Sequence, residues 1–231
     1  MIFKGLHKTS LVDYPEKIAA TLFVGGCNLR CPFCHNRDLV LGGELPDISE
    51  AEVLLHLGKR KRWLDGVCVS GGEPTLHKDL PVFLDKVKKL GFLIKLDTNG
   101  TNPGLLLQIV EGNLADYVAM DIKASLQNYD RTCGVSVDKK AIQESIDIIR
   151  KGSADYEFRT TAVPGFFDGK EARAIGRWLK GSKRYALQQF RPLGTIDPGL
   201  TKTRPFASSE LRKFGEIMKP YFSELVLRGA D

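Results

Sequence analysis

Three of the chain's five cysteines lie within eight positions, in the stretch GGCNLRCPFCHN at residues 25–36. They are Cys27, Cys31 and Cys34, and His35 follows the last of them. Thiolates bind zinc and iron–sulfur clusters, and a pair of cysteines can also carry redox chemistry or a covalently attached haem. The stretch therefore predicts a site of one of these kinds.

The spacing of the cysteines discriminates among these chemistries. Residues 31–35 match the C-x-x-C-H haem pattern and contain a thioredoxin-like C-x-x-C pair, but both interpretations leave Cys27 without a function. Structural zinc needs a fourth ligand, and His35 is a poor one because adjacent residues seldom both reach one tetrahedral ion. A [4Fe–4S] cluster uses all three thiolates and leaves one iron open to a small molecule. We favour the cluster, with zinc as the alternative.

Polar and glycine-rich motifs follow the later predicted strands at their carboxyl ends. These motifs are SGGEP (70–74), DTNG (97–100), DIK (121–123), VPG (163–165) and RPLG (191–194). Each alone could be a turn. Ligands of α/β folds bind at the carboxyl ends of the strands, so together the motifs predict one site that includes the cysteine stretch.

Strand-like apolar runs alternate with amphipathic helical patterns and would position these motifs. We predict strands over 18–24, 66–70, 92–98, 116–123, 155–163, 185–190 and 224–229. Helices are predicted over 49–62, 78–91 and 208–222, and around the apolar residues spaced at helical intervals in 142–149 and 174–178. The first of these helices begins with Ser49 and Glu52 in capping-box spacing. The alternation indicates an α/β fold with parallel strands, as a barrel or an open sheet, in a single domain over 1–231.

With these motifs assembled, the sequence resembles the radical S-adenosylmethionine (SAM) superfamily. CNLRCPFC fits its C-x3-C-x-aromatic-C signature, with Phe33 as the aromatic residue, and SGGEP at the next strand end makes the match highly specific. The resemblance covers essentially the whole chain. It implies a partial (β/α)6 TIM-like barrel of the radical SAM type and an oxidoreductase with a [4Fe–4S] cluster on Cys27, Cys31 and Cys34, whose open iron binds SAM.

The resemblance also implies contacts to SAM from residues at the strand ends. These residues are Gly71, Gly72, Glu73, Asp97, Asn99, Asp121, Lys123 and Arg191. The first three would receive the methionine amino group, and Lys123 would pair with the methionine carboxylate. Asp97 and Asn99 would lie by the ribose or nearby polar groups. Arg191 stands where pyruvate formate-lyase activases have a histidine that contacts the cofactor. In some activases the equivalents of Asp97, Thr98 and Asp121 hold a monovalent cation.

Within the superfamily the chain is most similar to the glycyl-radical-enzyme activases. CHNRDLV, DTNG, DIK and VPG fit their pattern, and SLVDYPEK, QQFRP and LVLRG are most similar to the activating proteins of anaerobic ribonucleoside-triphosphate reductase. An activase would reductively cleave SAM and remove a hydrogen from a glycine of a partner glycyl radical enzyme. The alternatives are a pyruvate formate-lyase-type activase and a small-molecule enzyme such as 7-carboxy-7-deazaguanine synthase.

Composition limits the location and the partners. No apolar run approaches the ~18 residues of a membrane span, and the N-terminus lacks a signal-peptide pattern. We therefore expect a cytoplasmic protein without membrane contact, with its thiols reduced. The net charge is +6, and the run GKRKRW (58–63) is interpreted as a solvated helix end. No nucleic-acid motif accompanies it, so direct nucleic-acid binding is not expected. An acidic electron donor, flavodoxin or ferredoxin, would complement the basic chain.

Three further residues have unusual positions in the predicted elements. Cys68 lies inside a predicted strand and is expected to be a small core residue. Cys133 is expected in a loop or the wall of the fold. Arg159 is a charged residue within the strand YEFRTTAV, and we expect it to point into the barrel.

Overall fold

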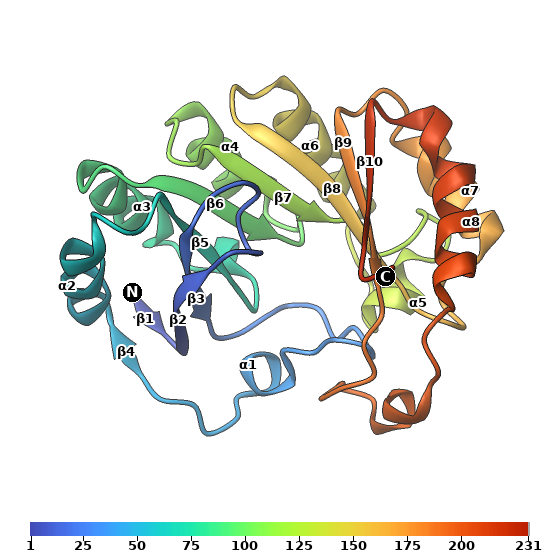
Figure 1. Ribbon diagram of the computed structural model, residues 1–231, viewed down its shortest axis with the longest axis horizontal. Coiled ribbons are helices and arrows are strands. Elements are labelled where there is room, and N and C mark those ends of the chain that lie inside the picture. The colour runs from blue at the N-terminus through green and yellow to red at the C-terminus, as the bar shows by residue number, and fades with distance from the viewer. Residues whose placement is uncertain (231) are drawn as a thin grey trace. The chain divides into compact units, whose positions relative to one another are not determined.

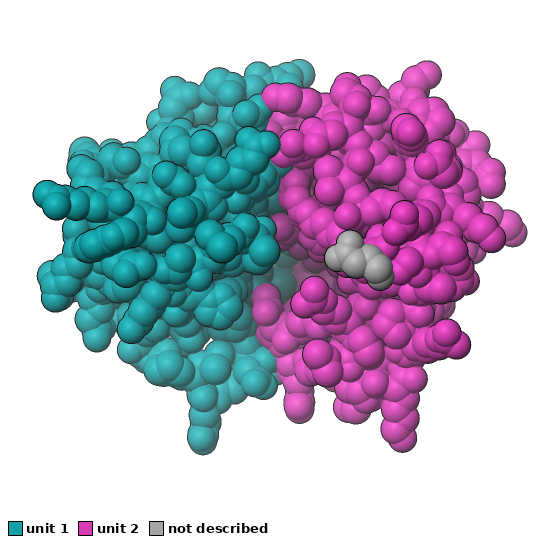
Figure 2. Space-filling model, in the orientation of Figure 1, with its two compact units in different colours: residues 1–28, 38–119, 140–155 teal, residues 29–37, 120–139, 156–231 magenta. Residues whose placement is uncertain are grey.

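The computed structural model describes residues 1–230, and the chain divides into two compact units. Unit 1 comprises residues 1–28, 38–119 and 140–155, and unit 2 comprises residues 29–37, 120–139 and 156–231 (Figure 2). The single domain over 1–231 stays a prediction.

The sheet of unit 1 is mostly parallel. Its strands are β2 (Gly5–Ser10), β3 (Ala19–Val24), β5 (Gly66–Gly71) and β6 (Leu93–Thr98), paired in that order (Figure 1). Only β2 pairs antiparallel, with β3. A second, two-stranded sheet joins β1 (Ile2–Phe3) to β4 (Ile48–Ser49). β7 (Tyr117–Asp121) starts in unit 1 and continues into unit 2.

The two faces of β3, β5 and β6 differ in polarity. The apolar face consists of two aligned rows, Ala20–Val67–Ile94 and Leu22–Val69–Leu96. The opposite face carries the aligned row Thr21–Cys68–Lys95, followed by Ser70 and Asp97 near the carboxyl ends. Strands of a parallel sheet are usually apolar on both faces. The polar face therefore indicates a function other than core packing.

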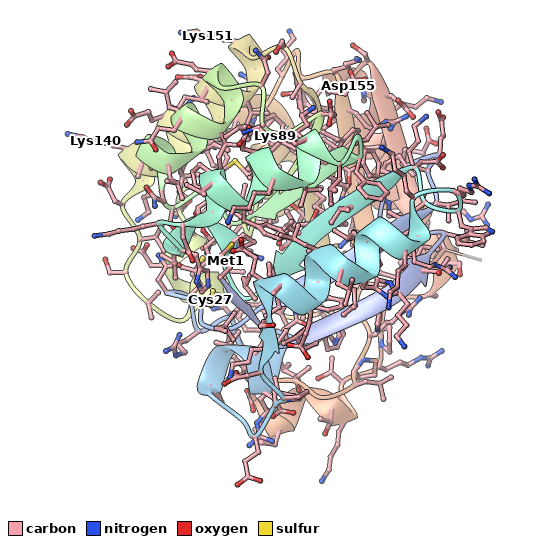
Figure 3. All side chains as sticks on the ribbon, turned by 90° about the vertical axis from the view of Figure 1, so that its left-hand side faces the viewer. Met1, Cys27, Lys89, Lys140, Lys151 and Asp155 are labelled. Carbon is pink, nitrogen blue, oxygen red and sulfur yellow. The ribbon has the colours of Figure 1, made fainter. Side chains whose placement is uncertain are left out.

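Helices supply the apolar partners of unit 1. They are α2 (Glu50–Arg60), the 3-10 turn η1 (Pro74–Leu76), α3 (Leu80–Lys89), α4 (Pro103–Glu111) and α6 (Lys139–Lys151). α3 buries its predicted apolar stripe of Leu80, Phe83, Leu84 and Val87. Figure 3 shows the helices of unit 1 from outside, with Lys89 on α3 and Lys140 and Lys151 on α6. The short helix α1 (Arg37–Leu41) follows the cysteine stretch.

Unit 2 contains three further parallel strands in the order β8-β9-β10. They are β8 (Asp155–Ala162), β9 (Arg184–Gln189) and β10 (Glu224–Arg228). The helical elements of this part are α5 (Tyr129–Cys133), α7 (Gly169–Trp178), η2 (Pro198–Lys202), α8 (Ser208–Met218) and η3 (Lys219–Tyr221).

The strands of unit 2 also have one apolar and one polar face. α8 lies against the apolar face, because a Cβ at Gly215 would be 3.1 Å from the Leu227 side chain and 3.3 Å from that of Leu225. The strand registers place Arg159, Gln188 and Arg228 on the opposite face, together with Glu157, which lies two residues before Arg159. We call this second face the polar face of unit 2.

The seven predicted strands are all present, with ends within two residues of the prediction. Strand β2 and helix α4 were not predicted. β2 is an edge strand of largely polar residues, so it lacks the apolar run by which the other strands were identified. α4 begins after Asn102, whose side chain accepts a hydrogen bond from the backbone N–H of Leu105 at 3.3 Å. Among residues 1–230, no helix combines the length and apolarity that a membrane span requires.

The predicted capping box at the start of α2 is present and generates a stability prediction. The backbone N–H of Glu52 donates to Ser49 Oγ at 3.3 Å, and the backbone N–H of Ser49 donates to Glu52 Oε2 at 2.8 Å. We expect Ser49→Ala to lower the free energy of unfolding by about 1 kcal/mol, because it removes the cap. Urea denaturation measures the change. Ser209→Ala, on an exposed residue of α8, is the control, and equal effects of the two substitutions would contradict the assignment.

Candidate active site

In unit 1, the carboxylate of Glu73 joins two strand-end loops. Glu73 is 0% exposed. Its Oε1 accepts hydrogen bonds from the backbone N–H and the hydroxyl of Thr75, at 3.0 and 2.6 Å, and from the hydroxyl of Thr98 at 2.8 Å. Its Oε2 accepts from the backbone N–H of Asn99 at 2.6 Å. Burial raises the pKa of Glu73, and these hydrogen bonds oppose the increase.

The glycine pair before Glu73 contacts the main chain that leads into the cysteine stretch. Gly71 has a φ of +114°, a conformation that favours glycine. A Cβ at Gly72 would lie 1.8 Å from the carbonyl oxygen of Gly26. The backbone N–H of Glu73 donates to the same oxygen at 2.8 Å. Only a residue without a side chain fits at position 72.

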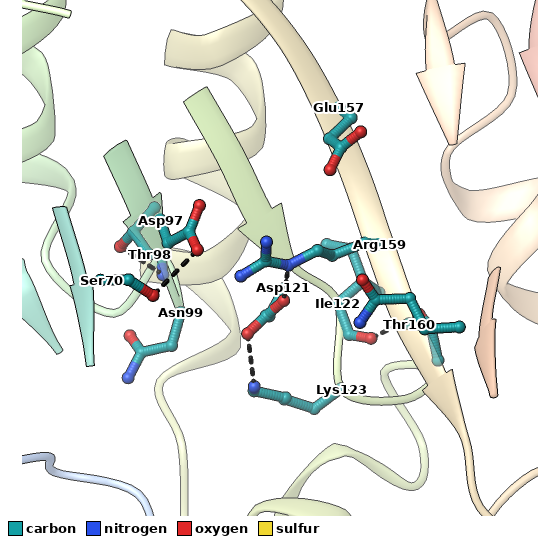
Figure 4. Close-up of polar contacts among 12 residues, drawn as sticks. Ser70, Asp97, Thr98, Asn99, Asp121, Ile122, Lys123, Glu157, Arg159 and Thr160 are labelled. Carbon is teal, nitrogen blue, oxygen red and sulfur yellow. Dashed lines mark hydrogen bonds and ion pairs between the residues drawn. The ribbon is translucent and has the colours of Figure 1, made fainter. Parts of the chain in front are cut away.

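Asp97 and Asn99 lie at the carboxyl end of β6, in the same unit as Cys27. Asp97 accepts hydrogen bonds from Lys95 and, at 2.9 Å, from the hydroxyl of Ser70 (Figure 4). The amide of Asn99 donates to Asn28 Oδ1 at 3.0 Å and lies 3.7 Å from the Cys27 thiol. The structure therefore brings together Cys27, the SGGEP loop and the DTNG loop within unit 1.

In unit 2, Asp121 is shared by two cations. Arg159 Nε donates to Asp121 Oδ1, and Lys123 Nζ donates to Oδ2 at 2.8 Å (Figure 4). Burial alone would raise the pKa of Asp121, but the charges of Arg159 and Lys123 hold it well below its usual value. Burial also acts to lower the pKa of Lys123, and the negative charge of Asp121 raises it above the ordinary value. All three groups are therefore charged at neutral pH.

Cys31 and Cys34 belong to unit 2, and the end of α5 supports their loop. The backbone N–H of Cys34 donates to the carbonyl of Cys31 at 3.0 Å, and that of Arg30 donates to the carbonyl of Cys133 at 2.8 Å. Gly134 follows α5 in the left-handed conformation, with φ +69°, and a Cβ there would be 2.3 Å from the Arg30 carbonyl oxygen. The expected wall residue Cys133 thus packs directly on the cysteine loop.

The charges around this loop favour a thiolate at Cys31. A hydrogen bond from the Cys133 thiol and the positive charge of Lys123 lower the pKa of Cys31 to about 7, although burial opposes them. Burial raises the pKa of Cys34. The hydrogen bond to Cys31 and burial together raise the pKa of Cys133, which keeps that thiol protonated. Cys31 is therefore the most readily deprotonated thiol of the three.

The loop after β9 carries Arg191, whose side chain is exposed. Its contact with SAM stays a prediction. His35 Nδ1 hydrogen-bonds the carbonyl of Leu193 at 2.9 Å, and its ring stacks on Phe190. His35 thus ties the cysteine loop to the loop over residues 190–194.

In each unit, the residues present suit the cluster and the SAM that the resemblance implies. Soft thiols suit a cluster, and the ion pair of Lys123 with Asp121 supplies a charged group for a zwitterionic amino acid. Within residues 1–230, however, no three side chains of His, Cys, Asp or Glu are grouped as a metal site. The ligand set of Cys27, Cys31 and Cys34 and the SAM contacts stay predictions.

Sequence reasoning missed several residues of these clusters. Lys95 and Thr75 hold predicted residues in place and were not named. Thr98 was named only for the cation site and Cys133 only as a loop or wall residue, whereas Thr98 binds Glu73 and Cys133 supports the cysteine loop. Glu157, Gln188 and Arg228 form a further polar group in unit 2. A detectable signal was the alternation of Glu157 and Arg159 along the predicted strand, which places both on one face.

Comparison with known proteins identifies relatives of the chain. The family model described as the radical SAM superfamily matches residues 21–174. A protein of Methanocaldococcus jannaschii named "Putative glycyl-radical enzyme activating enzyme" is 34% identical over 98% of this chain and 95% of its own length. The pyruvate formate-lyase-activating enzyme of Clostridium pasteurianum is 27% identical over 83% of this chain and 82% of its own.

Solved structures show the same fold. The crystal structure of a radical SAM methyltransferase from Sphaerobacter thermophilus matches with a TM-score of 0.70 and 16% identity, over 93% of this chain and 67% of that chain. At this identity the likeness shows the fold alone. It confirms the predicted α/β fold class, the partial (β/α)6 barrel of the radical SAM type.

The close approach at Gly72 generates a second prediction. We expect Gly72→Ala to lower the free energy of unfolding by about 3 kcal/mol, because the added methyl group collides with the main chain of Gly26. Gly58→Ala is the matched control, since a Cβ at this position in α2 meets nothing within 4 Å. We expect it to raise the free energy of unfolding by about 0.5–1 kcal/mol. Equal unfolding midpoints in urea for both variants would contradict the tight contact.

Proposed function

The chain belongs to the radical SAM superfamily, and we propose that it is a glycyl-radical-enzyme activase. The observation that carries this proposal is the alignment of nearly its whole length with the activating-enzyme relative of Methanocaldococcus jannaschii. The superfamily implies a [4Fe–4S] cluster and SAM as cofactors. When bound, they supply a one-electron cleavage of SAM and a radical that removes a hydrogen from the α-carbon of a glycine in the partner enzyme.

The chain's own residues would bind and orient these groups. Cys27, Cys31 and Cys34 are the proposed cluster ligands, and the lowered pKa of Cys31 favours the thiolate that ligation needs. Lys123 would pair with the methionine carboxylate. Asp121 binds Lys123 and is itself held by Arg159. The ammonium group of Lys123 is therefore held in place before SAM arrives.

In unit 1, the SGGEP and DTNG loops are also proposed to contact SAM. The buried bonds of Glu73 to Thr75, Thr98 and Asn99 fix the relative position of the two loops. The main chain of Gly71 and Gly72 would then accept the methionine amino group. Asp97 and Asn99 would lie by the ribose, and a monovalent cation at Asp97, Thr98 and Asp121 is also proposed, since oxygen ligands suit a hard cation.

The proposed partner is anaerobic ribonucleoside-triphosphate reductase. The motifs SLVDYPEK, QQFRP and LVLRG support it. Pyruvate formate-lyase is the second candidate, favoured by the likeness to the clostridial activating enzyme. A cytoplasmic location fits reduced thiols, and the net charge of +6 supports an acidic flavodoxin or ferredoxin as the electron donor.

The cluster assignment is tested with two buried cysteines that differ in role. After anaerobic reconstitution with iron and sulfide, we expect the wild-type protein to be brown and, once reduced, to form 5′-deoxyadenosine from SAM. Cys31→Ala should lose both properties, because only two ligands of the proposed set are left. Cys68→Ser, on a buried residue of β5 outside the proposed set, should keep both. A fully active Cys31→Ala variant would contradict the ligand assignment, and a colourless zinc-containing wild type would contradict the cluster.

The partner is tested by electron paramagnetic resonance. We expect the reduced protein with SAM to generate a glycyl radical signal on purified anaerobic ribonucleotide reductase. Pyruvate formate-lyase under the same conditions should give a much weaker signal. A strong signal on pyruvate formate-lyase alone would replace the first candidate with the second, and no signal on either would contradict both partner assignments.

A further inference from the structure

Arg228, the last residue of β10, is held in a fixed orientation by two side chains on the polar face of unit 2. Its NH1 group donates to Glu157 Oε1 at 2.8 Å, and its NH2 group donates to Glu157 Oε2 at 2.7 Å. NH1 also lies 3.3 Å from Gln188 Oε1. Two parallel hydrogen bonds between a guanidinium and a carboxylate fix both planes. The Arg228 side chain is therefore oriented before any ligand arrives.

The two members of the ion pair differ in their exposure to solvent. The Glu157 side chain is 0% exposed, whereas that of Arg228 is 35% exposed. The carboxylate is thus covered, and the guanidinium is the group that a ligand can reach. The three hydrogen bonds occupy three of the five N–H donors of an arginine. Within the described residues, the remaining donors are available to an acceptor from outside the chain.

The position of Arg228 connects it with the proposed SAM site of unit 2. Gln188 and Arg228 are register partners at the carboxyl ends of β9 and β10, where ligands of this fold class bind. Glu157 and Arg159 lie two residues apart on β8 and project to the same side of the strand (Figure 4). Arg159 in turn binds Asp121. The cluster of Glu157, Gln188 and Arg228 therefore continues the polar face beyond the Asp121 cluster.

The charge of the cluster selects the chemistry of its ligand. The negative charge of Glu157 offsets the positive charge of Arg228, so an anion gains little from binding there. A neutral hydrogen-bond acceptor suits the remaining N–H donors. A protein segment that presents a glycine has no side chain at that residue, so its recognition depends on main-chain groups. The carbonyl oxygen of a peptide is such an acceptor.

We propose that Arg228, oriented by Glu157 and Gln188, binds a main-chain carbonyl of the glycine-bearing segment of the partner protein. The proposal rests on the activase function proposed above and adds a residue that recognises the substrate. It assigns Glu157 and Gln188 as positioning residues, because they act on the substrate through Arg228.

The chain offers a matched control on the same face of the same two strands. Arg184 and Glu224 are register partners at the amino ends of β9 and β10. Arg184 donates to the two carboxylate oxygens of Glu224 at 2.7 and 2.9 Å. This pair also consists of two hydrogen bonds, through Nε and NH2 where Arg228 uses NH1 and NH2. It lies about 13 Å away from the carboxyl ends, at ~3.3 Å for each of four residues. It reports the effect of losing an arginine–carboxylate pair between strands.

The experiment measures the binding of a peptide to the reconstituted protein in the presence of SAM. The probe is an N-acetylated, C-amidated heptapeptide with a central glycine, titrated by calorimetry. We expect Arg228→Gln to weaken binding about tenfold, as for the loss of one hydrogen bond to a charged group. Arg184→Gln should bind the peptide as the wild type does. Arg228→Lys should give an intermediate affinity, since it keeps the charge and loses the planar fork.

A second variant covers the case in which Arg228→Gln does not fold. That substitution leaves the carboxylate of Glu157 buried without the guanidinium, which is strongly destabilising. The double variant Glu157→Gln with Arg228→Gln removes both charges, and we expect the same tenfold loss of affinity from it. Replacing the peptide's terminal amide with a carboxylate should not strengthen binding, and a large gain would contradict the neutral ligand.

The outcomes separate this inference from the proposed function. If the wild type and Arg184→Gln bind the peptide and the Arg228 variants bind it equally well, the inference is wrong and the activase function is unaffected. If the wild type cleaves SAM but neither binds the peptide nor activates a glycyl radical enzyme, the proposed function is wrong, and the inference fails with it.

Discussion

The carboxylate of Asp121, shared between Arg159 and Lys123, is the interaction on which the arrangement of unit 2 depends. It joins the end of β7 to β8 and to the loop that carries Lys123. The cations hold the pKa of Asp121 low, and Asp121 keeps Lys123 charged. Lys123 in turn lowers the pKa of Cys31. A change at Asp121 would therefore alter the charge of the proposed carboxylate-binding residue and of a proposed cluster ligand together.

Both units carry polar side chains on one face of parallel strands, and these side chains need hydrogen-bond or ionic partners. Buried polar groups are tolerated only when they are paired. In unit 1 the carboxylate of Glu73 meets this condition with four hydrogen bonds from two neighbouring loops. In unit 2, Asp121 is paired with Lys123 and Arg159, and Glu157 is paired with Arg228. The pairing holds the strand ends rigid, which is what a site that handles reactive intermediates requires.

Sequence reasoning succeeded where a local pattern carries the information. The apolar strand runs, the Ser49–Glu52 capping box and the cysteine spacing all depend on neighbouring residues, and the strands and the cap are confirmed. It failed for β2, whose place as a polar edge strand is set by its pairing with β3. It also missed contacts between residues far apart in the chain, such as that of Glu73 with Thr98 and that of Arg228 with Glu157, the latter 71 positions apart. The three-cysteine ligand set remains a prediction of the spacing and of the superfamily likeness.

The origin of the hydrogen in the 5′-deoxyadenosine product tests the central claim most directly. The reduced protein is incubated without oxygen with SAM and the glycyl radical enzyme, whose glycines are deuterated at the α-carbon. The account predicts 5′-deoxyadenosine that carries one deuterium, because its hydrogen comes from a glycine of the partner. Product without deuterium, formed while the partner is present and intact, would contradict the assignment as an activase.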